Sequence, residues 1–429
     1  MTKKNRKSNS LVIIAVLSIL VAALYTLLFV NIGFIGKQSI HEDAKRYSTR
    51  HCLVFYPDSK EGLKKAKELC KGVKDDSVHD YSLIPYGDYY LINYGGDYRY
   101  FTDSEFNPIR VEGISESGKN IVLDYLRYTI KKVNPEKYYN ADFLKSLNID
   151  SIDFETIEYD IDGENLTCYL KDYDLTLNIP LKYVQKEIGM DFGFPYELYT
   201  KPVYLSDSET HPIICLTFDD GPKLWTDEDY TSTEKIIDVL YEYDAAGTFY
   251  VVGNAMEDRE IWADYQVYTL LKKSINHGNE YGSHTQSHLY SLDELSSEES
   301  ILKEISGPIE YLEEFMNYEV KTYRPVEGRY NDLVLQAQPV GAILWDVDSE
   351  DWESDNAQQI IDQVLKYDYE SGDIILFHDI YNITADALEK IVPALINKGC
   401  QLVNVSTMLS YYDIDPSTLK YFYGSNYYE

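Results

Sequence analysis

Between residues 213 and 405 the sequence alternates short apolar runs with longer segments of helical periodicity, and this alternation restricts the possible folds more than any other feature. Strands are predicted for the apolar runs at 213–218, 248–252, 342–347, 374–377 and 401–405, with a further short strand just before residue 284. Helices are predicted between them, at 232–243, 262–276, 293–317, 356–368 and 384–397. Repeated strand–helix units favour a parallel sheet covered by helices. We therefore expect an α/β fold, a distorted (β/α) barrel, over residues 205–410.

The region from 40 to 200 has a different pattern and predicts a smaller α+β region. A stretch rich in proline, glycine and polar residues at about 186–210 separates the two regions. The predicted elements are a helix around 63–70, a hairpin of 89–94 with 98–101, a helix at 119–133 and a strand at 173–181. No catalytic side chains gather here at short spacing, so a spacer and a binding module both stay open.

The first 35 residues predict a membrane anchor. Four cationic residues, Lys3, Lys4, Arg6 and Lys7, precede an uncharged run at 11–30. Twenty helical residues span roughly 30 Å, the thickness of a bilayer core. The run exceeds the apolar core of a cleaved signal peptide, and a buried core helix would not begin with four cations. We expect a cytoplasmic tail at 1–10, a single transmembrane signal-anchor at 11–35, an extracellular remainder and a C-terminal tail at 411–429.

The net charge restricts the classes of binding partner, and the cysteine spacing restricts the kinds of metal site and disulfide. The formal net charge of -33 argues against nucleic acid, which requires clustered Lys and Arg. Five cysteines show no metal-finger spacing. Cys52 and Cys70 could form a disulfide in an oxidising exterior, whereas Cys215 and Cys400 lie in apolar runs and are expected to be buried free thiols.

Two adjacent carboxylates, Asp219 and Asp220, follow the first predicted strand and precede a Gly-Pro turn. Barrel active sites lie at the carboxyl ends of strands. Neighbouring residues point in different directions, so one carboxylate can bind a metal while the other reaches a water molecule. The alternative is a pair of turn or capping aspartates.

Two histidines, His284 and His288, follow the predicted short strand and a Gly-Ser bend. Imidazoles four residues apart, on a helical turn or in a tight loop, can converge on one metal ion. Such a pair can also be a polar surface turn.

Three further polar segments also end predicted strands. Arg324 has a permanent charge that can hold a carboxylate at two points. An acidic and aromatic segment contains Asp351 and Trp352, and the strand with Leu376 ends at His378. Each segment alone has a structural explanation, but five such segments, each at a strand end, indicate one site.

In this order the five segments resemble those of the NodB-homology polysaccharide deacetylases, carbohydrate esterase family 4, over roughly residues 211–408. The layout with an N-terminal region is most similar to membrane-anchored peptidoglycan N-acetylglucosamine deacetylases. The resemblance implies that a divalent metal, zinc before cobalt or manganese, binds to Asp220, His284 and His288.

The resemblance also implies the other roles. Asp219 would be the general base that takes a proton from the attacking water, and Arg324 would orient it. His378 would be the general acid for the departing amine, held by Asp351. Trp352 and Leu376 would wall the pocket for the acetyl methyl group.

Two positions depart from the family pattern. In place of the usual Arg-Pro-Pro-Tyr-Gly the sequence has Arg-Pro-Val-Glu-Gly at 324–328, so Glu327 stands where an aromatic residue would border the sugar. Its backbone N–H could still serve an oxyanion. Gln286 occupies the middle of the histidine segment, where an aromatic residue is common.

The implied activity is metal-dependent hydrolysis of N-acetyl groups from an extracellular glycan, in the first place N-acetylglucosamine of peptidoglycan. Poly-N-acetylglucosamine, chitin oligomers and O-acetylated xylan are alternative substrates. A catalytically inactive sugar-binding module is the alternative from another class.

Overall fold

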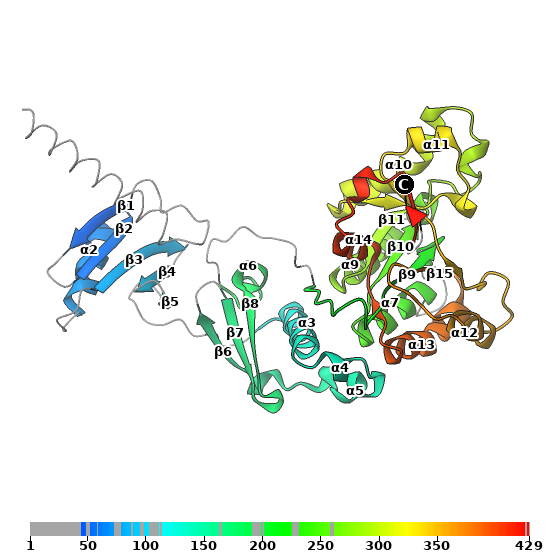
Figure 1. Ribbon diagram of the computed structural model, residues 1–429. Helices are drawn as coiled ribbons and strands as arrows, with labels where there is room; N and C mark the ends of the chain where they lie inside the picture. Colours follow the sequence, from blue (N-terminus) through cyan, green and yellow to red (C-terminus); the bar gives the residue numbers. More distant parts are fainter. Residues whose placement is uncertain are drawn as a thin grey trace, which may run out of the picture. The chain divides into compact units, whose positions relative to one another are not determined.

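The computed structural model of the chain is shown in Figure 1. It describes residues 44–48, 52–57, 59–72, 79–86, 89–94, 98–102, 111, 114–162, 165–190, 199, 201–224, 231–257, 261–424 and 427–428. The chain forms two compact units: unit 1 contains Met1–Gly118 and Thr156–Glu197, and unit 2 contains Lys119–Glu155 and Leu198–Glu429.

Unit 1 contains a mixed sheet of eight described strands that follow one another in sequence order. Only β2 and β3 pair in parallel, because the helix α2 (Lys60–Gly72) connects them, and the other neighbours are antiparallel. The strands are β1 (Ala44–Ser48), β2 (Cys52–Pro57), β3 (His79–Tyr86), β4 (Tyr89–Tyr94), β5 (Tyr98–Thr102), β6 (Glu158–Asp162), β7 (Asn165–Leu170) and β8 (Leu175–Pro180). The short helix α6 (Leu181–Val184) follows β8.

Several predictions for this region are confirmed. The expected helix is α2, and the expected hairpin is the antiparallel pair β4–β5. Tyr173 lies in a 3-10 turn (Lys171–Tyr173) rather than in the predicted strand, and Leu181 already begins α6. The prediction is too long at both ends, because the alternation of apolar and polar residues continues beyond the strand into these two turns. Cys70 is disulfide-bonded, whereas Cys168, Cys215 and Cys400 are free and buried.

Unit 2 contains a sheet of ten described strands in the order β14-β15-β9-β10-β11-β12-β13-β17-β18, with β16 pairing β9. All pairs are parallel except β17–β18. The strands are β9 (Ile213–Asp219), β10 (Gly247–Val251), β11 (Glu280–Ser283), β12 (Thr322–Tyr323), β13 (Gly341–Ile343), β14 (Val347–Asp348), β15 (Ile374–His378), β16 (Gln401–Leu402), β17 (Tyr421–Gly424) and β18 (Tyr427–Tyr428). Every residue of β9, β10 and β11 is buried, as expected for a parallel sheet covered by helices. The parallel sheet predicted from the alternating pattern is thus confirmed.

The predicted strand at 342–347 is wrong, because the chain makes two short strands there. β13 pairs with β12 and β17, whereas β14 lies at the opposite end of the sheet order beside β15. The three residues between them span at most about 14 Å, so the two ends of the sheet lie close and the sheet is curled into a half-barrel. The apolar run could not show this break, because each half is buried.

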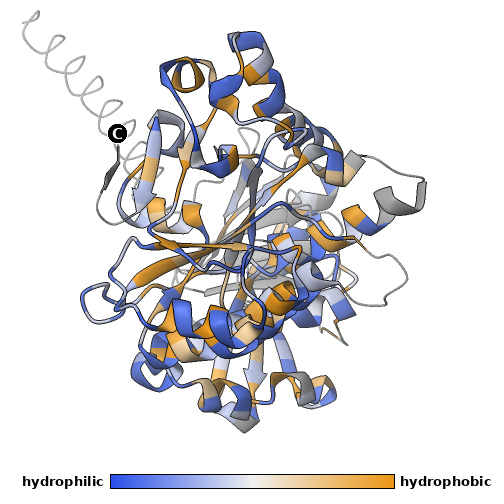
Figure 2. Ribbon diagram, turned by 90° about the vertical axis from the view of Figure 1, so that its right-hand side faces the viewer, coloured by the Kyte–Doolittle hydropathy of each residue, from blue (hydrophilic) through white to orange (hydrophobic). Residues whose placement is uncertain are grey.

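Helices surround the curled sheet, as the strand–helix alternation predicted. In Figure 2 they alternate between hydrophilic and hydrophobic residues, which is typical of helices with one face on a core. α13 contacts both α12 and α7, and α10 contacts α11, α8 and β11. The helices after β9 are α7 (Ser232–Glu242), α8 (Gly253–Glu257), α9 (Ile261–Asn276), α10 (Glu298–Met316), α11 (Asp332–Ala337), α12 (Ala357–Leu365), α13 (Asn382–Asn397) and α14 (Val405–Tyr411).

Most of α3 (Glu116–Val133), together with α4 (Pro135–Tyr138) and α5 (Ala141–Ser146), belongs to unit 2. The attachment centres on the buried carboxylate of Asp244, which pairs with the Lys201 ammonium and accepts a hydrogen bond from the Tyr138 hydroxyl. The Arg127 guanidinium of α3 lies 4.0 Å from the ring centroid of Tyr241 on α7. Buried charges such as those of Asp244 and Arg127 are tolerated only when they are paired. Because α3 and α4 supply part of this pairing, both helices are integral parts of unit 2.

Among the residues that the structure describes, none forms a helix that is long and apolar enough to cross a membrane. The run at 11–30, for which the sequence predicts an anchor, lies outside the described residues.

Candidate metal and active site

The predicted site residues come from the carboxyl ends of neighbouring strands. Asp219 ends β9, His378 ends β15, and these two residues are register partners in the parallel pair. On the other side, β11 ends at Ser283, directly before His284, and its register partner on β12 is Tyr323, directly before Arg324. Parallel pairing therefore brings groups that are 159 positions apart in sequence to one edge of the sheet.

Asp220, His284 and His288 form the tightest group. Each offers one ligand atom, and these atoms all lie within 4.8 Å of one another. The Asp220 Oδ1 atom lies 3.5 Å from His284 Nε2 and 3.1 Å from His288 Nε2. Asp220 Oδ1 is buried, yet no hydrogen bond of good geometry reaches it. A buried acceptor facing two imidazole nitrogens fits a cation between them.

The backbone at this group is held in an uncommon conformation. Asp220, Thr285 and His288 have positive φ angles of 76°, 72° and 52°. For a β-branched residue such as Thr285 this is a true outlier, with a cost of about 1–3 kcal/mol. The Thr285 side chain accepts a hydrogen bond from the His288 amide, so the strained turn fixes the second imidazole relative to the first. The tight-loop alternative for the histidine pair is therefore the one that the structure adopts.

The ionisation of Asp220 and His284 also suits metal binding. Burial would raise the pKa of Asp220, but His288, His284 and His378 outweigh it and lower the pKa to about 2. Burial lowers the pKa of His284, which favours the neutral imidazole that binds metals. Contact with Asp220 raises the pKa of His288 despite the opposing effect of burial.

One carboxylate and two imidazoles are the donor set of a catalytic zinc-type site, which needs three protein ligands and an open position. The orientation of His284 is fixed from behind, because its Nδ1 lies 2.9 Å from the Arg324 carbonyl oxygen. That contact directs Nε2 toward Asp220, as is usual for metal-binding histidines. The three residues thus fit a divalent cation.

Asp219 is held separately from this group. Its Oδ1 accepts a hydrogen bond of 2.9 Å from Nη1 of Arg324, while Oδ2 lies 3.7 Å from His284 Nε2. Both side chains of the pair are buried, and Arg324 is 0% exposed. Because the arginine occupies one oxygen, the other remains directed toward the metal group.

Arg324 is fixed on every side. Its Nη1 also donates to Thr217 Oγ1 (2.8 Å), and its Nε and Nη2 donate to the carbonyls of Ile343 and Leu344 at 3.0 Å each. Those two carbonyls are the last of β13 and the first after it, so the arginine binds where the curled sheet breaks between β13 and β14. The guanidinium also lies 4.4 Å from the ring centroid of Tyr250. A charge this deeply buried requires such complete pairing.

His378, which is partly buried, forms the second pair with the buried carboxylate of Asp351. Its Nδ1 lies 2.8 Å from Asp351 Oδ1, and its backbone N–H donates to Asp351 Oδ2 at 2.7 Å. The Thr384 hydroxyl donates to the same Oδ2 at 2.7 Å. Since Asp351 holds Nδ1, the proton on Nε2 faces the site.

The charge state of His378 follows from this pairing. Burial lowers its pKa, but the hydrogen bond and charge of Asp351, with the charges of Asp219 and Asp220, raise the pKa to about 9. The imidazolium is therefore the main form at neutral pH, as a proton donor requires.

The three predicted substrate-contacting residues differ in exposure. Leu376 is buried and shares a face of β15 with His378, two residues later. Trp352 is 55% exposed. Glu327 has a φ of 56°, and its carboxylate turns to Ser291 Oγ (3.1 Å) and Arg329 Nη1 (3.3 Å).

Sequence reasoning did not single out several supporting residues. Thr217 could have been suspected, because it precedes Asp219 by two positions and so shares its face of β9. Thr384 had no such signal, since it lies 33 positions after Asp351. In the sequence Gln286 stands out only as a departure from the family pattern, and its contacts with α8 and α10 become visible only in the structure.

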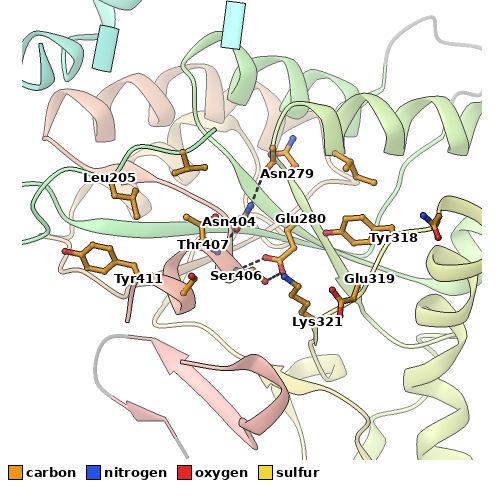
Figure 3. A pocket seen from close by; sticks show the side chains of 15 residues that line it. Leu205, Asn279, Glu280, Tyr318, Glu319, Lys321, Asn404, Ser406, Thr407 and Tyr411 are labelled. Carbon is orange, nitrogen blue, oxygen red and sulfur yellow. Dashed lines mark hydrogen bonds between the residues drawn. The ribbon is translucent and has the colours of Figure 1, made fainter. Parts of the chain in front are cut away.

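A groove of about 720 Å³ in unit 2 lies away from these groups, at the amino end of β11 (Figure 3). At its floor Glu280 accepts hydrogen bonds from Thr248 Oγ1 (3.0 Å) and from the Ser406 amide (2.9 Å). Asn404 donates to the Gly278 carbonyl at 2.9 Å. These polar groups satisfy one another, so the floor of the groove does not resemble a ligand site.

Comparison with known proteins finds relatives of this chain. The polysaccharide deacetylase family profile matches residues 206–339. The chain is 35% identical over 215 residues to the peptidoglycan-N-acetylmuramic acid deacetylase PdaC of Bacillus subtilis, a match that covers 50% of this chain and 42% of PdaC. It is 34% identical over 207 residues to a peptidoglycan-N-acetylglucosamine deacetylase of Bacillus cereus, covering 46% of this chain and 89% of that protein. The solved structure of Bacillus subtilis PdaC is 34% identical and matches 47% of this chain and 92% of that chain with a TM-score of 0.41.

This chain belongs to the polysaccharide deacetylase family, which comprises hydrolases. The matched part spans less than half the length of PdaC but most of the Bacillus cereus relative. The resemblance noted in the five strand-end segments is thereby confirmed.

Proposed function

We propose that this protein is a metal-dependent deacetylase that hydrolyses N-acetyl groups of an extracellular polysaccharide, with N-acetylglucosamine residues of peptidoglycan as its first substrate. The observation that carries the proposal is the convergence of three built groups at one edge of the sheet. These are the Asp220–His284–His288 triad, the Asp219–Arg324 pair and the His378–Asp351 pair. The substrate named for the Bacillus cereus relative supports the choice of sugar.

Asp219 acts as the general base in this proposal. Arg324 holds its Oδ1, so Oδ2 is free to take the proton of the attacking water. The guanidinium is pinned by two carbonyls, which keeps the carboxylate oriented throughout the reaction.

Asp220, His284 and His288 would hold the cation, with zinc as the first choice because its preferred ligands are of these types. When bound, a divalent cation supplies Lewis-acid activation of water and of the acetyl carbonyl. The backbone N–H of Glu327 would give a second contact to the developing oxyanion.

His378 supplies the proton to the departing amine. An amine leaves an amide readily only when it is protonated, and the imidazolium is positioned by Asp351 to donate from Nε2. Leu376 and the exposed ring of Trp352 would border the acetyl group.

We also propose that the protein is anchored by the run at 11–30 and that both units lie outside the cell. The basic flank of the run supports this orientation. A disulfide at Cys70 supports an oxidising compartment, since such bonds are rare in the cytosol.

Acetate release from defined glycans tests the proposal directly. Peptidoglycan should release acetate, and a chelator should abolish the release until zinc, cobalt or manganese is returned. Asp219→Asn should lower the rate by about 10²–10⁴-fold while leaving metal binding intact. Parallel assays on N-acetylmuramic acid-containing fragments, poly-N-acetylglucosamine, chitin oligomers and acetylated xylan identify the preferred substrate. Metal binding without acetate release from any of these glycans would instead favour an inactive sugar-binding module.

A further inference from the structure

We infer that helix α10 carries a dock for the loop 283–288 and that this dock sets the affinity of the site for its metal. The dock consists of Glu304, Gly307 and Pro308. The inference rests on the metal-dependent function proposed above, because the loop supplies two of the three ligands.

Pro308 lies inside α10 and has no backbone N–H. In a regular helix that N–H would donate to the carbonyl four residues earlier, which is the carbonyl of Glu304. The Glu304 carbonyl instead accepts a hydrogen bond of 2.7 Å from the backbone N–H of Gln286. One residue later, the Ile305 carbonyl accepts from the Ser283 hydroxyl at 2.8 Å. The proline thus frees an acceptor of the helix for the metal-ligand loop.

The Glu304 side chain continues the dock. Its carboxylate accepts from the Ser287 amide at 2.9 Å and from the Ser287 hydroxyl at 3.0 and 3.1 Å. Backbone and side chain of this one residue therefore bind positions 286 and 287. These positions lie directly before His288, whose Nε2 faces Asp220.

Two glycines make room for the Gln286 side chain. A Cβ atom at Gly307 of α10 would lie 2.0 Å from Gln286 Oε1, and one at Gly253 of α8 would lie 2.1 Å from the same atom. The Gln286 amide donates to Asn254 Oδ1 at 3.0 Å, and the Asn254 backbone N–H donates to the Gln286 carbonyl at 2.8 Å. The loop is therefore clamped between α8 and α10.

This clamp bears on metal affinity because the loop is strained. Thr285 and His288 both have positive φ angles, which a free loop would rarely adopt. Without the dock, metal binding would have to order this loop, and the cost would reduce the affinity. Supporting hydrogen bonds of this kind typically change metal affinity by about 10–100-fold.

The dock is tested by measuring the Kd for Zn²⁺, by chelator competition, in the full chain and its variants. Glu304→Ala removes the carboxylate and should raise the Kd about 10–100-fold. Pro308→Ala restores an N–H that competes for the Glu304 carbonyl and should raise the Kd up to about tenfold. Because alanine is the better helix former, Pro308→Ala should weaken metal binding without an equal loss of thermal stability.

Matched controls lie in the same unit. Pro393 is also a proline inside a helix, α13, and has Glu389 four residues earlier. Glu310 is an exposed glutamate of α10. Pro393→Ala and Glu310→Ala should leave the Kd within about twofold.

The possible failures are distinguishable. If the unaltered protein binds no metal, the proposed function fails. If it binds metal and both dock variants bind equally well, the proposed function stands and the dock is refuted. Should Glu304→Ala unfold, Gly307→Ala decides: displacing Gln286 should raise the Kd, and an unchanged Kd overturns the inference.

Discussion

The two ends of β11 place polar residues only four positions apart in opposite situations. At the amino end the buried carboxylate of Glu280 is surrounded by donors from Thr248 and Ser406. At the carboxyl end His284 faces Asp220, whose buried Oδ1 receives no well-formed hydrogen bond. Buried polar groups normally satisfy one another. The contrast indicates that the amino end of the sheet is built for stability and the carboxyl end for binding a ligand.

Among substitutions at the two ends of β11, His284→Ala is expected to have the largest effect on metal binding and activity. Loss of one ligand should abolish tight metal binding and lower the rate of acetate release by on the order of a thousandfold or more, since a cation contributes several kcal/mol to such reactions. Calorimetric titration with zinc and an acetate assay measure the two losses. Retention of full activity would place the metal elsewhere.

A smaller effect is expected from Asp351→Asn, and it should depend on pH. In the proposed function His378 donates a proton, so activity should fall as the pH rises through the His378 pKa of about 9. Removing the carboxylate takes away the hydrogen bond and charge of Asp351, which oppose burial most strongly, and leaves only the charges of Asp219 and Asp220 to oppose it. The pKa of His378 should therefore fall, and the loss of activity should move toward neutral pH. The rate near pH 7 should drop by about 10–100-fold.

The pH–rate profiles of both proteins check this prediction. Thr384→Val removes only one hydrogen bond to Asp351 and should shift the profile in the same direction by less. An unchanged alkaline limb in Asp351→Asn would mean that His378 is not the proton donor.

At the amino end of β11, Glu280→Gln should affect stability and leave metal binding and activity unchanged. The substitution weakens buried hydrogen bonds and should lower the free energy of unfolding by about 1–3 kcal/mol. Metal affinity and kcat of the folded protein should stay the same. Urea unfolding followed by kinetics at low temperature separates the two quantities, and a large change in kcat would contradict the division between the ends.

The smallest effect is expected from Trp352→Ala. The ring is 55% exposed, so its contact with the acetyl group can contribute only about 0.5–1.5 kcal/mol. We expect kcat/KM for the glycan to fall about two- to tenfold. An unchanged kcat/KM would show that the ring does not border the acetyl group.

Much of unit 2 could be predicted because it depends on two local sequence signals, the apolar runs and the polar residues that directly follow them. Buried parallel strands produce continuous apolar runs, and the polar residues directly after them, such as Asp219 and His378, must lie at one edge of the sheet. The same reasoning places Asp220, His284 and His288 at this edge, since they follow β9 and β11, but the resemblance to the family was needed to join them as one ligand set.

The remaining features depend on contacts between distant segments. The break between β13 and β14 follows from the curl of the sheet and from Arg324 binding the carbonyls at 343 and 344. The role of Thr384 depends on the position of α13 beside Asp351. Neither leaves a periodic pattern in the sequence, because hydroxyls and carbonyls occur everywhere along a chain.

The chain passes between its two units three times, near residues 118, 155 and 197. Unit 2 is therefore made of two segments that are separate in the sequence. A fragment that began at residue 205 would retain the sheet and every proposed ligand. It would lack Lys201 and Tyr138, which meet the buried carboxylate of Asp244. Asp244 would lose both its cation and its hydroxyl donor, so such a fragment should be less stable than unit 2. Recombining this domain with other proteins requires a graft in two pieces, 119–155 and 198 onward.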